Sequence, residues 1–177
     1  PFSLEITDTE LTRKVEKMPF VPEEEQERRK RCEEIFHMQS MGLKKRLEHT
    51  HCKNAVIGIS GGLDSTLALL VTVRAFDLLG LPHENIKAVT MPGFGTTDRT
   101  YENAVNMIKS FGADFSEVSI KKAVTVHFED IGHDINVHDV TYENSQARER
   151  TQILMDIANR VNGMVVGTGD LSELALG

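Results

Sequence analysis

From residue 55 onward, short apolar runs alternate with longer segments whose apolar spacing is typical of helices. The apolar runs read AVIGIS, KAVTM, FSEVSI and GMVVGT. The helical segments are at residues 64–80, 98–112, 121–130 and 143–161. Short runs that are apolar on both faces and alternate with helices are typical of a parallel sheet covered on both sides. The sequence therefore predicts a doubly wound α/β fold.

Glycines support the predicted ends of these helices. Gly80, Gly112 and Gly163 each follow a helical segment, where a left-handed C-terminal cap favours glycine.

The region before residue 55 is organised differently. Residues 1–22 include Pro19 and Pro22 and show no sustained apolar period, as expected of a linker or tail from a missing upstream domain. The charged stretch that follows carries apolar residues at three- and four-residue spacing, which predicts one long amphipathic helix. We therefore expect a tail at 1–22 and a single domain at 23–177 that is truncated at its C-terminal end.

Composition excludes several classes of function. The net charge of −7 offers no basic surface for nonspecific nucleic-acid binding. No apolar run approaches the roughly 20 residues that a bilayer requires, and the sequence does not start with a basic and then apolar leader. Cys32 and Cys52 lack the spacing of a zinc site or a disulfide framework. We expect a cytoplasmic protein that binds neither nucleic acid nor membrane.

The motif SGGLDST at residues 60–66 joins the run AVIGIS to the helical segment that follows it. A helix start offers unpaired N–H groups and a positive dipole end, and adjacent glycines let the backbone approach an anion. Asp64 beside a phosphate needs a cation between the two negative charges, and Mg²⁺ is the natural bridge. In the alternative interpretation, Ser60 only caps the helix and Asp64 complements its dipole.

Three further segments follow the ends of predicted strands. The loop MPGFGTTD at 91–98 either contacts adenosine or forms a turn in which Asp98 caps the next helix. In the segment YENSQARER, Arg148 and Arg150 lie on different helix faces, and we expect Arg150 at the surface in ion pairs four residues apart. In GTGDLSELALG, Glu173 offers a hard oxygen ligand for Mg²⁺, unless this segment is only a capped strand-to-helix turn.

In this order, the motifs resemble those of the ATP-pyrophosphatase superfamily, whose phosphate loop reads SGGxDS. Residues 144–150 match the NxQARxR segment of the NAD synthetases, and residues 167–177 match the GTGDLSELALG segment of the same family. Leu63, the segment MPGFGTTDRT and the long leading helix are closer to the glutamine-dependent form than to the ammonia-dependent form. The resemblance covers residues 22–177 and implies an adenine-nucleotide alpha-hydrolase-like (Rossmann-like) sandwich.

The resemblance also implies which residues form the site. Asp64 and Glu173 would be the catalytic residues and would bind Mg²⁺. Deamido-NAD would contact Asn144, Arg148 and Glu173. ATP or the leaving pyrophosphate would contact ten residues, which are Gly58, Ser60, Gly61, Gly62, Leu63, Asp64, Ser65, Thr66, Met91 and Thr168.

The implied reaction is the ATP-dependent amidation of deamido-NAD to NAD through an acyl-adenylate, with release of AMP and pyrophosphate. In the full protein, ammonia would come from glutamine by way of an upstream glutaminase domain, and we expect a homo-oligomer. Two other interpretations stay open. The chain could be another amide ligase or a tRNA-modifying enzyme of the superfamily, or a noncatalytic fragment that binds nucleotide.

Three histidines, His127, His133 and His138, are near one another in the sequence. Their spacings fit neither one helix face nor a common zinc motif, so we expect a solvated loop there.

Overall fold

The computed structural model describes residues 3, 8, 10, 12–95 and 98–176, with the backbone alone for residues 98–100. The chain divides into two units, Pro1–Ile35 and Phe36–Gly177. In the first unit, the residues between 12 and 24 form turns and bends ahead of a helix. There Nη1 of Arg31 donates to the backbone oxygen of Phe20 at 3.0 Å.

The long leading helix predicted from the sequence is present as α1, Glu25–Thr50. Within the second unit, its apolar side contributes Leu47, which is 1% exposed, to the hydrophobic core. The buried Ser40 hydroxyl donates to the backbone oxygen of Phe36 at 2.8 Å, so its burial leaves no unpaired polar group. Among the described residues, every helix is too short or too polar to cross a bilayer.

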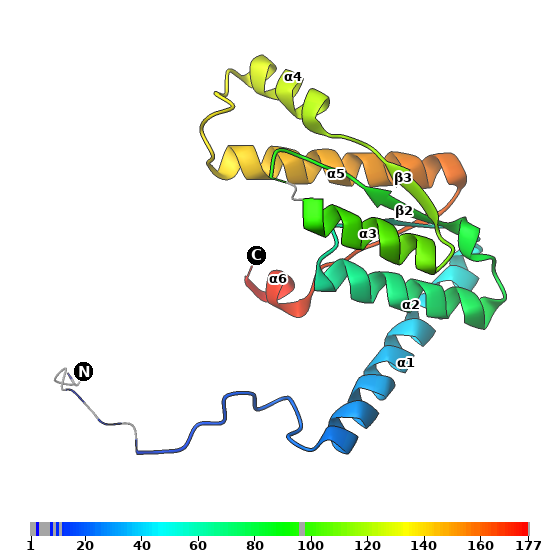
Figure 1. Cartoon of the computed structure of the whole chain (residues 1–177), viewed down its shortest axis with the longest axis vertical. Helices are drawn as coiled ribbons and strands as arrows, with labels where there is room; N and C mark the ends of the chain where they lie inside the picture. The colour runs from blue at the N-terminus through cyan, green and yellow to red at the C-terminus, as the bar shows by residue number, and fades with distance from the viewer. Residues whose placement is uncertain (1–2, 4–7, 9, 11, 96–97, 177) are drawn as a thin grey trace. The chain divides into compact units, whose positions relative to one another are not determined.

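A four-stranded parallel sheet forms the centre of the second unit (Figure 1). Its strands are β1 (Ala55–Gly58), β2 (Ile86–Thr90), β3 (Asp114–Glu117) and β4 (Met164–Val166). They are ordered β3-β2-β1-β4, and every neighbouring pair is parallel. All four carboxyl ends therefore lie at one edge of the sheet, where ligands bind in open α/β folds.

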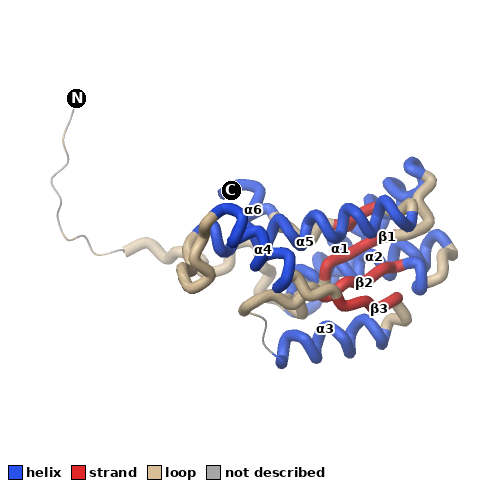
Figure 2. The backbone as a smooth tube through the Cα atoms, turned by 90° about the horizontal axis from the view of Figure 1, so that it is seen from above, coloured by secondary structure: helices blue, strands red, loops and turns tan. Residues whose placement is uncertain are grey.

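Helices cover both faces of this sheet (Figure 2). On one face, α1, α2 (Leu63–Leu79) and α3 (Asp98–Ser110) pack on Ile57 and Ala88. On the other face, α5 (Val140–Val161) packs on Val56 and Val89. The predicted doubly wound α/β fold is confirmed.

The remaining elements complete the unit. A short 3₁₀ helix, η1 (His83–Asn85), precedes β2, and α6 (Leu171–Leu176) follows β4. Helix α4 (Lys121–Ile131) packs on the first turn of α5 in a separate cluster. The buried members of that cluster are Ile120, Val124, Phe128 and Tyr142.

Two of the three predicted glycine caps are confirmed. Gly80 and Gly112 have φ values of +64° and +69°. The cap of α5 is Asn162 instead, with a φ of +50°, so the prediction for Gly163 is wrong. A Cβ atom at position 163 would lie 2.9 Å from the backbone oxygen of Asn54, so this glycine serves a close approach between two chain segments.

The strand predicted at residues 115–120 is shifted in the structure. It ends at Glu117, and Ile120 turns away from the sheet to pack with α4. The prediction of strands that are apolar on both faces is also wrong for β3. Its residues are exposed apart from the half-buried Phe115, because β3 is an edge strand that pairs only with β2. The run AVIGIS likewise ends as a strand at Gly58, and Ile59 and Ser60 begin the loop.

Candidate functional site

A pocket of about 780 Å³ opens at the carboxyl ends of β1 and β2. Its wall combines the loop after β1, the loop after β2, the start of α3, the first turns of α5 and the residue Thr168 after β4. The residues that line it include Gly58, Ser60, Thr90, Tyr101, His138 and Arg150.

The loop after β1 is held by its own hydroxyl groups. Gly61 has a φ of +84°, a conformation that residues with a Cβ atom rarely adopt. The buried Ser65 Oγ donates to the Gly62 backbone oxygen at 3.1 Å and accepts from the Ser60 N–H at 3.3 Å. Thr66 Oγ1 also donates to the Gly62 oxygen, at 2.8 Å. The loop is therefore shaped before any anion arrives.

The N-cap residue of α2 is Gly62 and not Ser60, although Ser60 Oγ accepts from the Gly62 N–H at 3.3 Å just ahead of the helix. Among the described residues, no side chain bonds the N–H groups of residues 63–65 in the first turn. The side chain of Asp64 is exposed and, within the described residues, has no hydrogen-bond or ion-pair partner. This helix start therefore keeps donors and a carboxylate available for a ligand.

Gly58 brings the end of β1 close to the opposite wall. A Cβ atom at this position would lie 3.1 Å from Met91 Cε and 3.1 Å from Leu154 Cδ1. Gly58, Met91 and Leu154 all line the pocket, and the contact of the first two with ATP stays a prediction.

Two side chains of α5 hold the loop after β2. Nε of Arg150 donates to the Met91 backbone oxygen at 3.2 Å. Oε1 of Gln146 accepts from the Phe94 N–H at 3.2 Å. Arg150 was expected at the surface in ion pairs, and that expectation is wrong. It lies one helical turn after the buried Gln146, so both side chains share the face that meets the pocket.

Asn144 and Arg148 lie on other faces of α5. Both are exposed, and neither lines the pocket. Their predicted contact with deamido-NAD stays a prediction.

Aromatic rings cover the end of the pocket nearest to α4. The His138 ring stacks on Tyr142 with ring centroids 4.3 Å apart, and Phe94 lies 5.9 Å from Tyr142. All three line the pocket. His138 is exposed, as expected for a solvated loop, but its place on the pocket wall was missed because histidine spacing alone does not report stacking.

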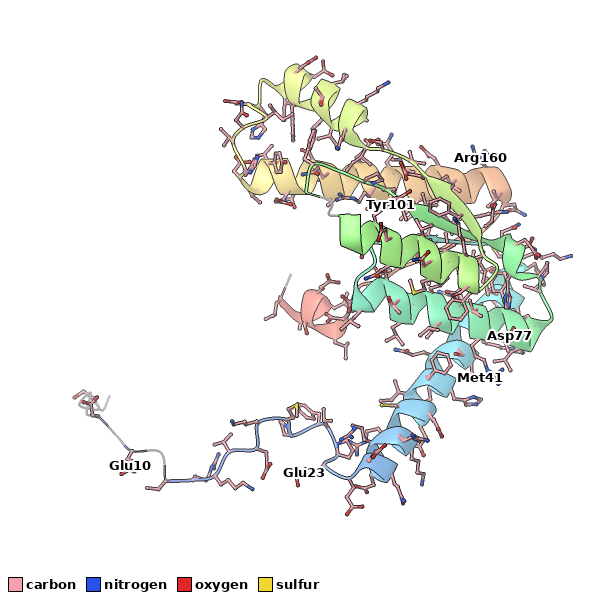
Figure 3. The ribbon with its side chains drawn as sticks, viewed as in Figure 1. Glu10, Glu23, Met41, Asp77, Tyr101 and Arg160 are labelled. Carbon is pink, nitrogen blue, oxygen red and sulfur yellow. The ribbon has the colours of Figure 1, made fainter. Side chains whose placement is uncertain are left out.

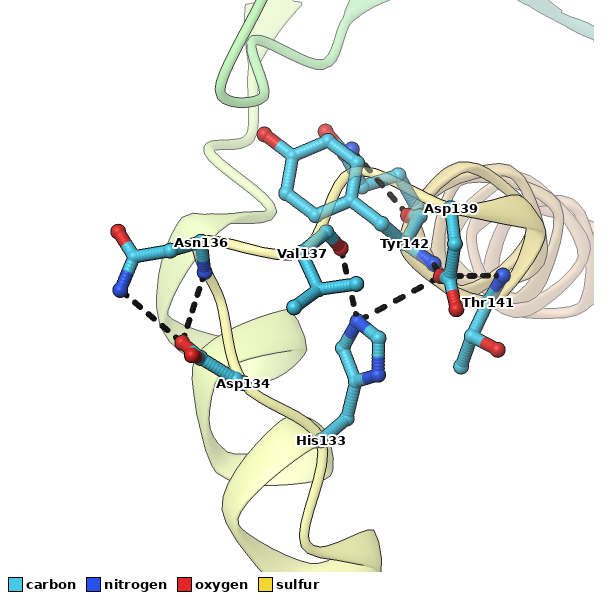
Figure 4. A network of polar contacts seen from close by, with 8 residues as sticks. His133, Asp134, Asn136, Val137, Asp139, Thr141 and Tyr142 are labelled. Atoms are coloured by element: carbon cyan, nitrogen blue, oxygen red, sulfur yellow. Dashed lines mark hydrogen bonds and ion pairs between the residues drawn. The ribbon is translucent and has the colours of Figure 1, made fainter.

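The start of α5 is fixed by the network in Figure 4. Oδ1 of Asp139 accepts from the backbone N–H groups of Thr141 and Tyr142 at 2.9 and 3.0 Å, as an N-terminal cap does. The bond from the Tyr142 N–H, with smaller contributions from nearby His133 and from the Thr141 N–H, lowers the pKa of Asp139. Nε2 of His133 lies 3.6 Å from the same oxygen.

Thr168 and Glu173 follow β4. Thr168 lines the pocket. Glu173 and Asp170 cap α6 reciprocally: Asp170 N–H donates to Glu173 Oε2 at 3.1 Å, and Glu173 N–H donates to Asp170 Oδ1 at 2.9 Å. Such a capping box satisfies two otherwise unpaired donors, so the capped-turn interpretation of this segment is correct as structure.

Thr90 and Tyr101 belong to the wall but were not predicted from the sequence. Thr90 Oγ1 is buried and has no hydrogen-bond partner within the described residues. The Tyr101 hydroxyl bonds Glu117, which raises the pKa of Tyr101. Neither residue belongs to a sequence motif, and only the fold brings them to the pocket.

The donor set available to a metal ion consists of separate carboxylates. Within the described residues, no group of three or more His, Cys, Asp or Glu side chains converges. Mg²⁺ commonly uses one or two carboxylates and completes its shell with water and substrate phosphate oxygens. Exposed Asp64 and Glu173 suit that kind of site.

Comparisons with known proteins agree with this fold. The family model described as NAD synthase matches residues 35–177. A glutamine-dependent NAD(+) synthetase of Mycobacterium leprae is 46% identical over 171 residues, which are 94% of this chain and 25% of that protein. An NH(3)-dependent NAD(+) synthetase of Staphylothermus marinus is 35% identical over 76% of this chain and 47% of its own.

Among solved structures, a glutamine-dependent NAD+ synthetase from Acinetobacter baumannii in complex with ADP has a TM-score of 0.74 and 30% identity. The match covers 81% of this chain and 27% of that one. The chain thus spans about a quarter of the length of the glutamine-dependent relatives it matches. Since the family match covers most of the sequence, including every motif discussed above, the chain belongs to the NAD synthase family.

Proposed function

We propose that the pocket binds ATP and deamido-NAD and serves the ATP-dependent amidation of deamido-NAD to NAD. The observation that carries this proposal is the SGGLDST loop. In a chain of the NAD synthase family, it presents the uncapped start of α2 beside a nucleotide-sized pocket at the strand ends.

ATP is proposed to bind with its phosphates at the start of α2. Gly61 and Gly62 allow close approach, and the free N–H groups of the first turn favour negative charge. Met91 and Thr168 on the pocket wall suit the nucleoside. When bound, Mg²⁺ would neutralise charge on the pyrophosphate, with Asp64 and Glu173 as its protein ligands.

The proposed chemistry follows from the stability of a carboxylate. Ammonia does not displace oxide from a carboxylate, so the nicotinic carboxylate oxygen first attacks the α-phosphorus of ATP and pyrophosphate leaves. Ammonia then attacks the acyl carbon, and AMP leaves as the amide forms. The chain's contribution is to position the two substrates and to stabilise developing negative charge.

The rest of the longer protein is proposed to supply the ammonia. Relatives of four times this length are named glutamine-dependent, so we propose an upstream glutaminase domain and a homo-oligomeric assembly. Unpaired Cys32 and Cys52 suit a reducing compartment, which supports a cytoplasmic location.

Pyrophosphate release from ATP, Mg²⁺ and ammonium tests this proposal. The assay compares deamido-NAD with no acceptor, for the 177-residue chain and for a longer form that continues past residue 177. We expect release that depends on deamido-NAD, with NAD as the product. No such dependence in either form would reject the proposal.

A further inference from the structure

We infer that Arg150 is the oxyanion-binding residue of the pocket wall, and that its guanidinium contacts a phosphate or carboxylate oxygen of the bound substrates. The inference deepens the proposed function, on which it rests for the identity of the substrates. It does not rest on Asn144 and Arg148, the positions of the same segment that are predicted to contact deamido-NAD.

The first observation is the position of the guanidinium. Arg150 is half-buried on the pocket wall, between Gln146 and Leu154 on the same face of α5. Within the described residues, no carboxylate lies within 4.0 Å of its nitrogen atoms. A guanidinium removed from water normally has an acidic partner, so one that faces a ligand pocket without such a partner is suited to a bound anion.

The second observation is how the side chain is fixed. Its Nε–H is used by the Met91 backbone oxygen at 3.2 Å, and that bond holds the guanidinium plane against the loop after β2. The Nη1 and Nη2 groups make no hydrogen bond with other described residues. They remain as a planar pair of donors, which is the arrangement that binds phosphate and carboxylate in two-point contacts.

The third observation concerns the surrounding charge. Burial lowers the pKa of Arg150, and Glu143 two turns earlier on α5 opposes that shift from beyond ion-pair distance. Among the described residues that line the pocket, Glu143 is the acidic one, and it is exposed. A bound oxyanion would offset the cost of burying the guanidinium. The fixed positive charge of Arg150 would in turn raise the affinity of the pocket for that anion.

Binding measurements on four forms of the chain test the inference: wild type, Arg150→Lys, Arg150→Met and Arg160→Met. Arg160 is an exposed arginine near the other end of α5 (Figure 3), which makes it a matched control. The probes for calorimetry are ATP, pyrophosphate, deamido-NAD and neutral adenosine. Thermal melting without ligand checks that each variant is folded.

We expect Arg150→Met to weaken binding of at least one anionic probe by about 10- to 100-fold, as for loss of a charged hydrogen bond, with adenosine unchanged. Arg150→Lys should recover only part of that loss, because it keeps the charge but not the planar donors. Loss with ATP or pyrophosphate identifies a phosphate contact. Loss confined to deamido-NAD identifies an acceptor contact.

Four results would overturn the inference. For Arg150→Met, they are unchanged affinity for every anion, an equal loss of affinity for adenosine, or a loss no larger than that of Arg160→Met. The fourth is a wild-type chain that binds none of the anionic probes. Arg150-dependent ATP binding without amidation of deamido-NAD would keep the inference and reject the proposed function, so the two can fail separately.

Discussion

Gly93 lies directly against the guanidinium of Arg150. A Cβ atom at position 93 would be 2.8 Å from Nη2 of Arg150 and 2.5 Å from Oε1 of Gln146. These contacts are shorter than carbon atoms tolerate, so a larger residue would displace the two side chains that hold the loop after β2. A glycine in a loop thereby sets the position of a cation on a neighbouring helix.

For Gly93→Ala we therefore expect weakened ATP binding together with a loss of about 1–2 kcal/mol in the free energy of unfolding, the cost of two disturbed hydrogen bonds. Urea unfolding and calorimetry would measure both effects. Gly95→Ala is the stability control, because a Cβ placed there has no heavy atom of the described residues within 4 Å apart from its chain neighbours. Equal stability losses in the two variants would contradict the steric explanation.

We expect the hydroxyl of Ser65 to stabilise the loop after β1. It accepts from the Ser60 N–H and donates to the Gly62 oxygen from a buried position. Ser65→Ala therefore removes the partner of the Ser60 N–H, whereas the Gly62 oxygen keeps its bonds from the hydroxyl and the N–H of Thr66. We expect a loss of about 1–3 kcal/mol in the free energy of unfolding and weaker pyrophosphate binding. The control is Ser110→Ala, at the exposed end of α3. Unchanged pyrophosphate affinity in Ser65→Ala would mean that the loop keeps its shape without these bonds.

His83 should make stability depend on pH. Its Nε2 lies 2.8 Å from Asp77 Oδ1 and its Nδ1 lies 2.8 Å from the Phe111 backbone oxygen. Both partners are acceptors, so only the charged ring satisfies both. The bond to Asp77, followed by the bond to Phe111, raises the pKa of His83 above 6.5.

Because the folded-state pKa is raised, this stabilisation is complete below the unfolded pKa of about 6.5 and is lost as pH rises through the folded value. Urea unfolding between neutral and mildly alkaline pH should show stability falling in wild type and a flatter profile in His83→Gln. Exposed His37→Gln is the control. A profile in His83→Gln as steep as that of wild type would assign the dependence to another group.

Glu173→Gln separates two roles of one carboxylate. The amide oxygen can still accept the bond from the Asp170 N–H, so the start of α6 should keep its cap, but the charge proposed to bind Mg²⁺ is gone. We expect ATP affinity to fall several-fold with Mg²⁺ present and to stay unchanged without it. The control is Glu129→Gln on the surface of α4. Equal ATP affinity of variant and wild type in Mg²⁺ would remove Glu173 from the proposed metal site.

The order of elements in the fold could be predicted because its signals are local. Apolar runs such as AVIGIS mark buried strands, and glycines such as Gly80 mark helix ends. The predicted cap at Gly163 was wrong because asparagine can take the same left-handed conformation, and Asn162 does so. Gly163 is needed instead for its close approach to Asn54, which is distant in sequence.

The strand-loop-helix geometry of the SGGLDST segment could be predicted because consecutive residues form it. The opposite wall could not, because it depends on which face of α5 turns toward the sheet. That choice is made by the packing of Leu154 and Ala158 on distant strands, and it turns Arg150 inward and Arg148 outward. Thr90, Tyr101 and His138 come from other elements and were missed because only the fold brings them to the pocket wall.

Helix α5 is therefore divided along its length. Its last turns pack Ala158 against Val56 and Val89, while its first turns carry Tyr142, Gln146 and Arg150 to the pocket. Because α5 is one continuous helix of 22 residues, the position of its last turns on the sheet also determines the position of its first turns. Substitutions in the first half therefore alter the pocket wall directly, whereas substitutions in the second half reach it only through the packing of α5 on the sheet.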